Sequence, residues 1–541
     1  MSKHFRYILL LILFIEAIFF LWENYNHTGT FNLPTDDGYI YLNYIKNAAS
    51  GHFFEYNIGE KSAGVTGFLW YVILTPVFFI SRFFFYNIYK ALLFSNYLVG
   101  ISLLALSLYF LLKLSEFLFE SQYVSLICGI LFLLNSKLIW GAVSGMEVPL
   151  TAFMILLAAH TFFKEYDEGI LRFSPFAFGL CGWAREELYI FPTMAMIFLS
   201  LEHFGLISKV FDSKRTLIKP KELMRFALIT ISTAVIPLII YWYFTGLLFP
   251  TPYYIYVGPG YDFANLWKRY LAIADQLDSY HIFLYLFATI GIIFAIAKKA
   301  KPFQNFFWAT TVFAFFTWKA FKSIYLGWVF RYITPYDPII SIGAGFGLFF
   351  LVESVYKNLT KDIKSHNHLI CIKGIIILPF LFLFCYFCLN FFNFARNEYP
   401  LHIQNVNDAH VSVAEWISKN LPPETVITSD PIGATKLFSG RKTIDTVGLT
   451  THEMIGHSPG VKTDLRYWIY LIEYMKFKKS NYLLYSRKNF INDTPFPFLR
   501  LVHSFLVPND ISTNGAPFEI YQVDWLIYNK TMENFLSQIP K

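Results

Sequence analysis

The sequence predicts an α-helical polytopic membrane domain of about 11 spans, followed by a small external α/β domain. Of the 541 residues, 55% are hydrophobic and 20% are aromatic, which is more apolar surface than the interior of a soluble protein can hide. Runs such as 91–112 and 374–392 approach the roughly 20 apolar residues that a helix needs to cross a bilayer. After residue 393 the apolar runs shorten and turn-forming residues recur. We therefore expect a membrane domain at 1–393 and an external domain at 394–541.

The crossings are expected at 7–22, 66–86, 90–112, 122–140, 146–163, 173–201, 223–245, 281–297, 303–318, 331–352 and 369–393. The first is not a cleavable signal, because no small-residue cleavage site follows it. Its external loop, 23–65, is long. The run 173–201 is interrupted by Arg185-Glu186-Glu187, so it is either one broken helix or two short ones. With one helix, Glu147 lies on the cytoplasmic side. With two, an upstream segment is re-entrant and Glu147 changes sides.

We attribute the net charge of +7 to the orientation of the chain in the membrane and not to nucleic-acid binding. Basic residues gather in a few loops, which is typical of cytoplasmic loops in membrane proteins. These residues are Lys3, Arg6, Lys209, Lys214, Arg215, Lys219, Lys221, Arg225, Lys298, Lys299, Lys301, Lys357, Lys361 and Lys364. The first external loop and the C-terminal domain then lie outside. That domain contains no cysteine, which is compatible with the bacterial inner (cytoplasmic) membrane.

Within the C-terminal domain, short helical and strand patterns alternate. Helices are expected at 409–420 and 463–478, and strands at 425–429, 442–447, 482–486, 499–506 and 518–527. This order favours an α/β fold. His452 and His457 resemble a zinc-protease motif, but they are five residues apart with a glycine between them, so we interpret them as ordinary loop residues.

Asp36 and Asp37 stand side by side just after the first span. Two adjacent carboxylates repel each other unless a cation or proton donor is near. Such a pair suits a general base, or a ligand for a divalent cation that also contacts phosphate. The alternative is an acidic turn that caps the helix beginning near Gly38, because Asp is a good N-cap residue. A divalent cation is the one cofactor that the sequence leaves open, and no metal ligand is assigned.

Two further charged groups interrupt apolar sequence. Glu147 lies at the mouth of an apolar run, where a buried acid indicates function, although an acid at a helix N-terminus is also favoured by the helix dipole. Arg185 and Glu187 lie between two apolar halves. A guanidinium near the membrane surface suits a lipid phosphate, but Arg185 can equally pair with Glu187.

An ordered set of motifs resembles the GT-C membrane glycosyltransferases, in particular the group that includes the mycobacterial terminal arabinofuranosyltransferase. The motifs are Asp36-Asp-Gly-Tyr-Ile-Tyr-Leu-Asn-Tyr44, Tyr56-Asn-Ile-Gly-Glu60, Gly64-Val-Thr-Gly-Phe-Leu-Trp70, Ser144-Gly-Met-Glu147, Ala184-Arg-Glu-Glu187, Tyr243-Phe-Thr-Gly-Leu-Leu-Phe-Pro-Thr251, Arg331-Tyr-Ile-Thr-Pro335, Ile432-Gly-Ala434, Phe438-Ser-Gly-Arg441 and Asp445-Thr-Val-Gly-Leu449. The resemblance covers nearly the whole chain. It implies a hexosyl- or pentosyltransferase that moves a sugar from a polyprenyl-phosphate donor to a glycan or glycolipid acceptor on the outer face.

The resemblance places the catalytic acid in the first external loop, at Asp36 or Asp37. Asp36 is favoured as the base, because Asp37 lies nearer the expected helix start. Substrate contacts are expected at Glu147, Arg185, Glu187, Lys319, Lys322 and Arg331. The arginines and lysines among them would stabilise the leaving phosphate. For Arg331 the alternative is an ion pair with Asp337. The rival function is a transporter or flippase of a lipid-linked sugar, which the long acidic loop, the external domain and the lack of an inverted repeat disfavour.

Overall fold

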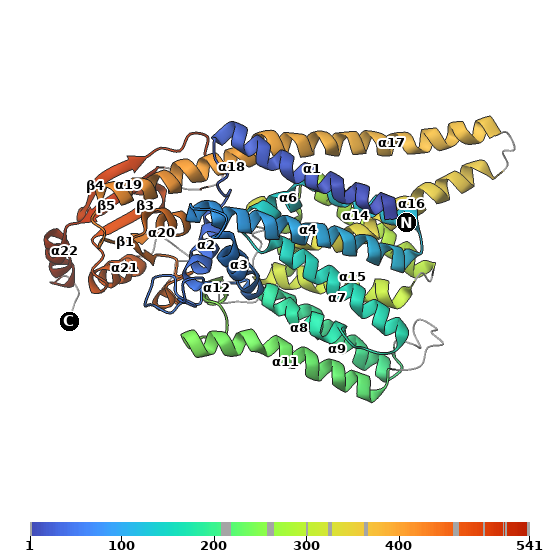
Figure 1. Cartoon of the computed structure of the whole chain (residues 1–541), viewed down its shortest axis with the longest axis horizontal. Helices are drawn as coiled ribbons and strands as arrows, with labels where there is room; N and C mark the ends of the chain where they lie inside the picture. Colours follow the sequence, from blue (N-terminus) through green and yellow to red (C-terminus); the bar gives the residue numbers. More distant parts are fainter. Residues whose placement is uncertain are drawn as a thin grey trace.

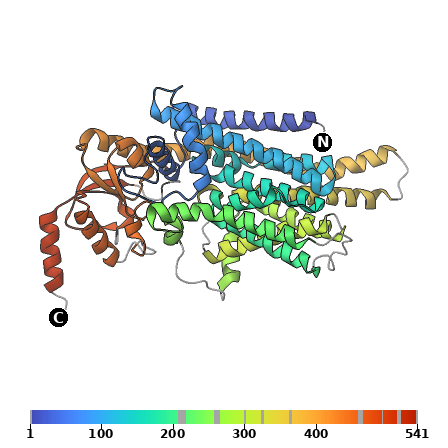
Figure 2. The same ribbon diagram turned by 60° about the horizontal axis from the view of Figure 1, so that its bottom comes forward.

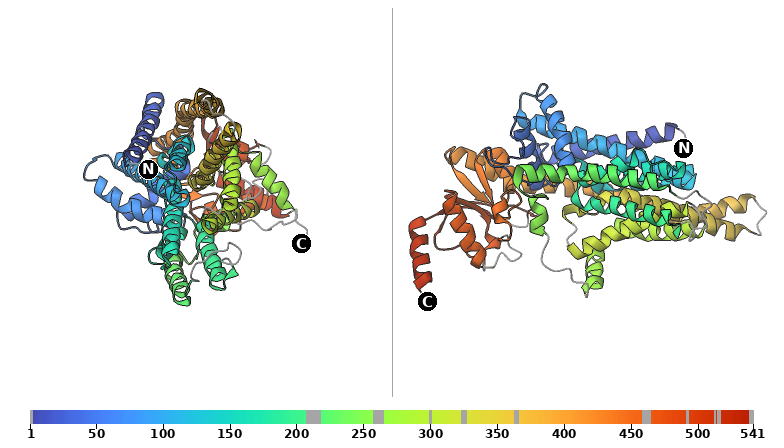
Figure 3. Two further views of the ribbon diagram at one scale, coloured as in Figure 1. Left: turned by 90° about the vertical axis from the view of Figure 1, so that its right-hand side faces the viewer. Right: turned by 90° about the horizontal axis from the view of Figure 1, so that it is seen from below.

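The computed structural model describes residues 3–206, 218–256, 265–298, 301–322, 327–361, 366–457, 465–490, 493–511, 513 and 517–537. Long helices lie side by side as a bundle, and the α/β domain sits at one end of it (Figure 1). The N-terminus lies toward the opposite end, and α16 and α17 reach beyond the other helices there (Figure 1). The rotated views in Figure 2 and Figure 3 keep this arrangement, with the sheet at the end of the bundle.

Among the described residues, seven helices are long and apolar enough to cross a membrane, or eight if the bent pair α5 and α6 forms one span. The chain is therefore a multi-pass membrane protein. The long helices are α1 (Lys3–Thr28), α4 (Ile88–Phe119), α7 (Val148–Glu168), α11 (Pro220–Thr245), α14 (Ser279–Ala297), α16 (Asp337–Thr360) and α17 (His366–Asn393), and the bent pair is α5 (Gln122–Leu133) with α6 (Ser136–Val143). The remaining helices outside the C-terminal domain are α2 (Asp36–Ala48), α3 (Phe68–Ser81), α8 (Ser174–Ala184), η1 (Glu186–Tyr189), α9 (Ile190–His203), α12 (Thr251–Tyr256), α13 (Leu266–Ala274), α15 (Pro302–Lys322), η3 (Trp328–Phe330) and η4 (Thr334–Tyr336).

The eleven predicted crossings are more than the seven or eight spans found among the described residues, and three of the predicted crossings account for the difference. The crossing expected at 66–86 is α3, whose 14 residues span only about 21 Å, less than the hydrocarbon core of a bilayer. The run 173–201 is two short helices, α8 and α9, separated by η1. α15 has 21 residues, but polar side chains such as Gln304 and Asn305 interrupt it, and it does not count among the seven.

The position of Glu147 follows from the packing of the turn that precedes α7. Gly38, near the start of α2, packs against the turn before α7, and a Cβ on Gly38 would come within 2.4 Å of the Ser144 carbonyl oxygen. α5 and α6 meet at 58°, as in a broken span or a re-entrant segment. Glu147 therefore shares one end of the bundle with Asp36 and Asp37, which is the second of the two alternatives that the sequence left open.

Basic residues mark the opposite end of the bundle. Arg6 of α1 forms an ion pair with Glu116 of α4, and Lys301, just before α15, lies 2.6 Å from a carboxylate oxygen of Asp167 in α7. Lys209, Lys214, Arg215, Lys299 and Lys364 lie outside the described residues.

α17 runs on into the α/β domain. Two π-helical turns, η5 (Phe394–Glu398) and η6 (Asn407–Val411), join it to α18 (Tyr399–Val406) and α19 (Ser412–Asn420). The domain boundary predicted at residue 393 thus falls within a continuous helical run. This run carries the chain from the bundle directly onto the sheet (Figure 1).

Among the described residues of the C-terminal domain, five strands form one mixed sheet with the order β2-β1-β3-β5-β4. They are β1 (Val426–Ser429), β2 (Lys442–Asp445), β3 (Tyr482–Ser486), β4 (Leu499–Phe505) and β5 (Phe518–Val523). β1 is parallel to β2 and β3, whereas β5 is antiparallel to β3 and β4. The helical elements around the sheet are α20 (Gly433–Ser439), η7 (His452–Met454), α21 (Leu465–Phe477), η8 (Arg487–Asn489) and α22 (Trp525–Ser537).

Alternating side chains of the strands build two cores. Leu483 and Tyr485 of β3 pack with Trp468 of α21 on one face, whereas Leu484 packs with Ile417 of α19 on the other. This arrangement confirms the predicted α/β domain. The strand expected at 518–527 is too long, because Asp524 accepts hydrogen bonds from the next turn and starts α22 at Trp525.

Candidate functional site

Asp36 and Asp37 are the first two residues of α2, but their side chains meet different partners. The Asp36 carboxylate accepts hydrogen bonds from the backbone amides of Gly433 and Ala434, both at 2.8 Å. The Nδ1 atom of His410 lies 3.3 Å from the same carboxylate. Gly433 is required here, because a Cβ at that position would lie 2.1 Å from the Asp36 carbonyl oxygen. Asp36 thus caps α20 rather than its own helix, and it joins the membrane domain to the α/β domain.

The charge of Asp36 is stabilised by these contacts. Burial alone would raise the pKa of the Asp36 carboxyl, but His410 and the two backbone amides outweigh it and hold the pKa below its usual value. Only 14% of the side chain is exposed. The carboxylate is therefore ionised and largely occupied by protein donors.

Asp37 lies closer to solvent and meets a cation. One of its carboxylate oxygens is 2.6 Å from Nη1 of Arg331, and a third of the side chain, 33%, is exposed. Arg331 itself is buried. Its guanidinium also donates a hydrogen bond to the Tyr332 hydroxyl at 3.1 Å. The contact joins an accessible carboxylate to a buried arginine.

Three of the predicted substrate-binding cations meet around the ring of Tyr332. Lys319 Nζ lies 4.5 Å from the ring centre, and the guanidinium carbons of Arg185 and Arg331 lie 5.0 and 5.1 Å from it. All three cationic side chains are buried. We call Arg185, Lys319, Arg331 and Tyr332 the cation cluster. Lys322 ends α15, and its side chain is outside the described part of the structure.

Glu147 and Glu187 complete the surroundings of Arg185. Nη1 of Arg185 donates to Glu147 at 2.8 Å, and Nε lies 2.5 Å from Glu187. The local pair that the sequence offered as an alternative is therefore present, with Glu147 added to it. Burial lowers the pKa of Arg185, but Glu187, Glu147 and the neighbouring Glu186 outweigh burial and raise it above its usual value. Glu147, Arg185 and Glu187 thus form one buried ionic group at the break between α8 and η1.

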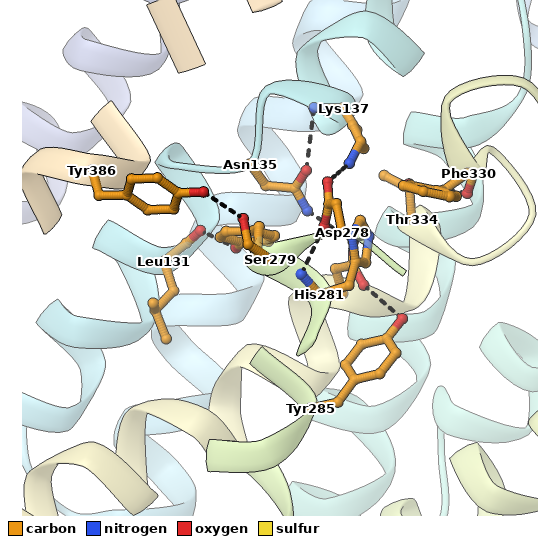
Figure 4. Close-up of polar contacts among 12 residues, drawn as sticks. Leu131, Asn135, Lys137, Asp278, Ser279, His281, Tyr285, Phe330, Thr334 and Tyr386 are labelled. Carbon is orange, nitrogen blue, oxygen red and sulfur yellow. Dashed lines mark hydrogen bonds and ion pairs between the residues drawn. The ribbon is translucent and has the colours of Figure 1, made fainter. Parts of the chain in front are cut away.

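The alternative pairing of Arg331 with Asp337 is wrong, because Asp337 belongs to a different polar cluster. Its carboxylate accepts from Asn135 at 2.8 Å and from Tyr285 at 3.2 Å, and it lies 3.1 Å from Nε2 of His281. On its other side, His281 meets Asp278, which also forms an ion pair with Lys137 (Figure 4).

The cluster around Asp337 supports the segment that carries Arg331. The Phe330 ring lies 5.0 Å from the His281 ring, and Lys137 Nζ lies 4.3 Å from the centre of the Phe330 ring. Sequence reasoning did not identify this cluster. The available signal was the presence of Asn135, His281 and Asp337 at the starts of apolar helices, where polar side chains are costly without partners.

The two carboxylates of the acidic pair have different neighbours. Both oxygens of Asp36 accept a backbone amide, whereas one oxygen of Asp37 lies beside the Arg331 guanidinium. Within the described residues, no three His, Cys, Asp or Glu side chains gather in a way that could hold a metal ion. His452 and His457 do not share a helical face either, because η7 ends at Met454.

Comparisons with known proteins agree with this architecture. Residues 401–527 match a family model described as a domain of unknown function, DUF8728. No curated protein sequence matches the chain. One similar structure is the archaeal oligosaccharyltransferase AglB from Archaeoglobus fulgidus, in complex with an inhibitory peptide and a dolichol-phosphate. It is 12% identical with a TM-score of 0.55, over 97% of this chain and 77% of that one.

Two further structures have the same arrangement. The Archaeoglobus fulgidus oligosaccharyltransferase tethered to an acceptor peptide is 12% identical, with a TM-score of 0.54 over 96% of this chain and 76% of that one. ArnT from Cupriavidus metallidurans, bound to undecaprenyl phosphate, is 10% identical, with a TM-score of 0.53 over 94% of this chain and 97% of that one. At these identities the likeness concerns the fold alone. The chain has a GT-C-like fold, a helical membrane domain with a C-terminal α/β domain.

Proposed function

We propose that this protein is a membrane glycosyltransferase that moves a sugar from a polyprenyl-phosphate donor to an envelope glycan or lipid acceptor on the outer face of the membrane. The observation that carries the proposal is the contact between Asp37 and Arg331. It sets an accessible carboxylate beside the cation cluster, so a proton acceptor and a phosphate-binding group lie together. Two proteins of similar fold support it: the ArnT structure contains bound undecaprenyl phosphate, and the AglB structure contains a dolichol-phosphate.

In the proposed reaction, Asp37 takes the proton of an acceptor hydroxyl while that oxygen attacks the anomeric carbon of the donor sugar. The new carbon–oxygen bond forms as the bond between the anomeric carbon and the phosphate oxygen breaks. The electron pair of that bond leaves with the polyprenyl phosphate. Proton release from Asp37 to solvent then restores the carboxylate.

Asp37 is a better candidate for the base than Asp36, which the sequence favoured. A base must reach its substrate within hydrogen-bond distance. Asp37 has the more exposed carboxylate, whereas Asp36 is engaged with two amides of α20. We therefore assign Asp36 a positioning role, in which it holds the α/β domain against α2.

The cation cluster is proposed to bind the donor phosphate. Negative charge grows on the phosphate oxygens as the sugar leaves, and buried cations stabilise such charge strongly. Arg331 and Arg185 present planar forks of N–H donors that match phosphate oxygens, and Lys319 adds a point charge. Glu147 and Glu187 would hold Arg185 in place for this contact. Lys322 remains a predicted member of the set.

The orientation of the chain follows from its basic residues. Arg6 and Lys301 lie at the end of the bundle opposite the α/β domain, and basic residues favour the cytoplasmic side. We therefore propose that the α/β domain is periplasmic and that the chain lies in a bacterial inner membrane. A hexosyl- or pentosyltransferase of the arabinofuranosyltransferase-like group is the finer form of the proposal, and it rests on the motifs of the sequence.

The test is transfer of a labelled sugar from polyprenyl phosphate by membranes that contain the protein. Asp37→Asn should lower the rate by a factor of about 10² to 10⁴, the usual contribution of a general base. Asp275→Asn, which changes an exposed acid at the end of α13 in the same way, is the matched control and should keep full activity. If liposomes with the wild-type protein move the intact labelled lipid across the bilayer and form no product, the chain is a flippase and the proposal fails.

A further inference from the structure

A cavity of about 290 Å³ lies where the first external loop, the C-terminal end of α11 and the α/β domain meet. Its walls include Glu60 and Lys61 of the loop, Phe244 of α11, Glu453 of η7, and Tyr474 and Lys478 in and after α21. The volume is close to the lower end of the roughly 300–1,000 Å³ range of ligand pockets, which suits a small ligand or the end of a longer chain. We call it the interdomain cavity.

The charges in the walls of this cavity balance each other. Lys478 Nζ lies 3.2 Å from Glu453 and 3.7 Å from Glu60. Lys61 is held 2.8 Å from Glu55, behind the wall. Two carboxylates and two ammonium groups thus line the space, with no net charge from these four groups. Outside the lining, Glu55 and Lys442, whose Nζ lies 2.6 Å from Glu60, add one charge of each sign.

Two aromatic rings fix the positions of these cations. Lys478 Nζ lies 5.5 Å from the centre of the Tyr474 ring, and Lys61 Nζ lies 5.3 Å from the centre of the Phe244 ring. Tyr474 is itself largely buried, and burial followed by the nearby Glu453 raises the pKa of its hydroxyl well above the usual value. The hydroxyl therefore stays protonated beside Glu453.

The cavity is connected to the acidic pair by a short path. Tyr56 lines the cavity and donates a hydrogen bond from its hydroxyl to the Ile432 carbonyl at 2.7 Å. The next residue, Gly433, donates its amide hydrogen to Asp36. The wall of the cavity and the start of α2 therefore contact the same backbone segment, Ile432 and Gly433, of the α/β domain.

We propose that the interdomain cavity is a binding subsite for the acceptor, and that the acceptor is a neutral saccharide at this subsite. Sugar hydroxyls both donate and accept hydrogen bonds, which matches walls that contain both carboxylate and ammonium groups. A phosphate or a uronic acid gains nothing from a cavity without net positive charge, in contrast to the cation cluster. The inference rests on the proposed function, because only a transferase needs an acceptor.

The experiment measures glycan binding without turnover. Purified full-length Asp37→Asn protein in nanodiscs is applied to an array that carries neutral, acidic and amino-sugar oligosaccharides, with unrelated peptides beside them. Binding to neutral oligosaccharides is expected. Glu453→Gln should weaken that binding about tenfold or more, because one charged hydrogen-bond acceptor is lost. Glu415→Gln changes an exposed acid on α19 and should leave binding unchanged.

The remaining outcomes overturn the inference. They are binding to no glycan, binding only to acidic glycans or to peptides, and neutral binding that Glu453→Gln leaves unchanged. The proposed function is judged separately by transfer with the wild-type residue at position 37. If Glu453→Gln loses binding to neutral glycans but the wild-type protein transfers no sugar, the transferase is refuted and the saccharide site is kept. Full transfer with an unchanged acceptor KM in Glu453→Gln would refute the subsite but keep the transferase.

Discussion

Replacing Asp36 with alanine should release the α/β domain from α2. The change leaves the amide hydrogens of Gly433 and Ala434 without their 2.8 Å acceptors, and His410 without its carboxylate. Hydrogen bonds to charged groups contribute about 1.5–3 kcal/mol each, so the two amides together account for about 3–6 kcal/mol of docking free energy. Because Asp37 makes neither contact, Asp37→Ala is the matched control for this loss.

Hydrogen exchange measures this release directly. Amides in α20 should lose protection by a factor of about a hundred or more in Asp36→Ala, whereas Asp37→Ala should keep wild-type protection. The Asp36 pKa is depressed in the folded protein, so its contribution is complete above the unfolded value of about 4. It is lost only as the pH falls through the lower folded value, and measurements near neutral pH are therefore unaffected. Unchanged exchange in α20 after Asp36→Ala would refute the anchoring role.

Three other substitutions test separate parts of the molecule. Arg331→Lys keeps the charge but loses the fork, so donor saturation kinetics should weaken about tenfold to a hundredfold while the acceptor KM stays constant; an unchanged donor KM and turnover would remove Arg331 from the phosphate site. Asp337→Leu leaves the buried Asn135 and His281 and the half-buried Tyr285 without an acceptor, so it should lower the free energy of unfolding by about 3 kcal/mol or more. Tyr285→Phe should cost only about 1 kcal/mol, and equal losses would contradict the cluster. Burial raises the Asp445 pKa to about 7, whereas the same carboxyl ionises near pH 4 in the unfolded chain. The free energy of unfolding of the α/β domain should therefore fall as the pH rises from about 4 to about 7. Asp445→Asn should reduce this pH dependence, and an unaltered pH dependence would exclude Asp445 as its cause.

Local patterns predicted much of the α/β domain. The strand expected at 482–486 is β3, and the helix expected at 463–478 contains α21. Both follow from the period of the buried side chains, which depends only on neighbours in sequence. The strand expected at 518–527 was too long because Asp524, a single capping residue, overrides the apolar pattern that continues after it.

The membrane domain was predicted in class but not in every crossing. Apolar length identified the long helices, whereas α3 is too short to cross and the break at Arg185 divides 173–201 into two helices. Hydropathy does not show whether an interrupted run continues or turns back. The packing of Gly38 against Ser144, which places Glu147 beside the acidic pair, depends on contacts between distant segments.

From the sequence alone, we predicted the membrane class of the chain, the α/β character of residues 394–541 and the residue types available for chemistry. We singled out Asp36, Asp37, Arg185, Lys319 and Arg331, because charge is costly at the edges of apolar runs wherever it occurs. Which of these charges lie together depends on how the chain folds. Asp36 binds an amide 397 residues away, and its neighbour Asp37 binds Arg331 instead. Electrostatic partners are chosen by distance and burial in space, and a one-dimensional pattern of charges does not contain that information.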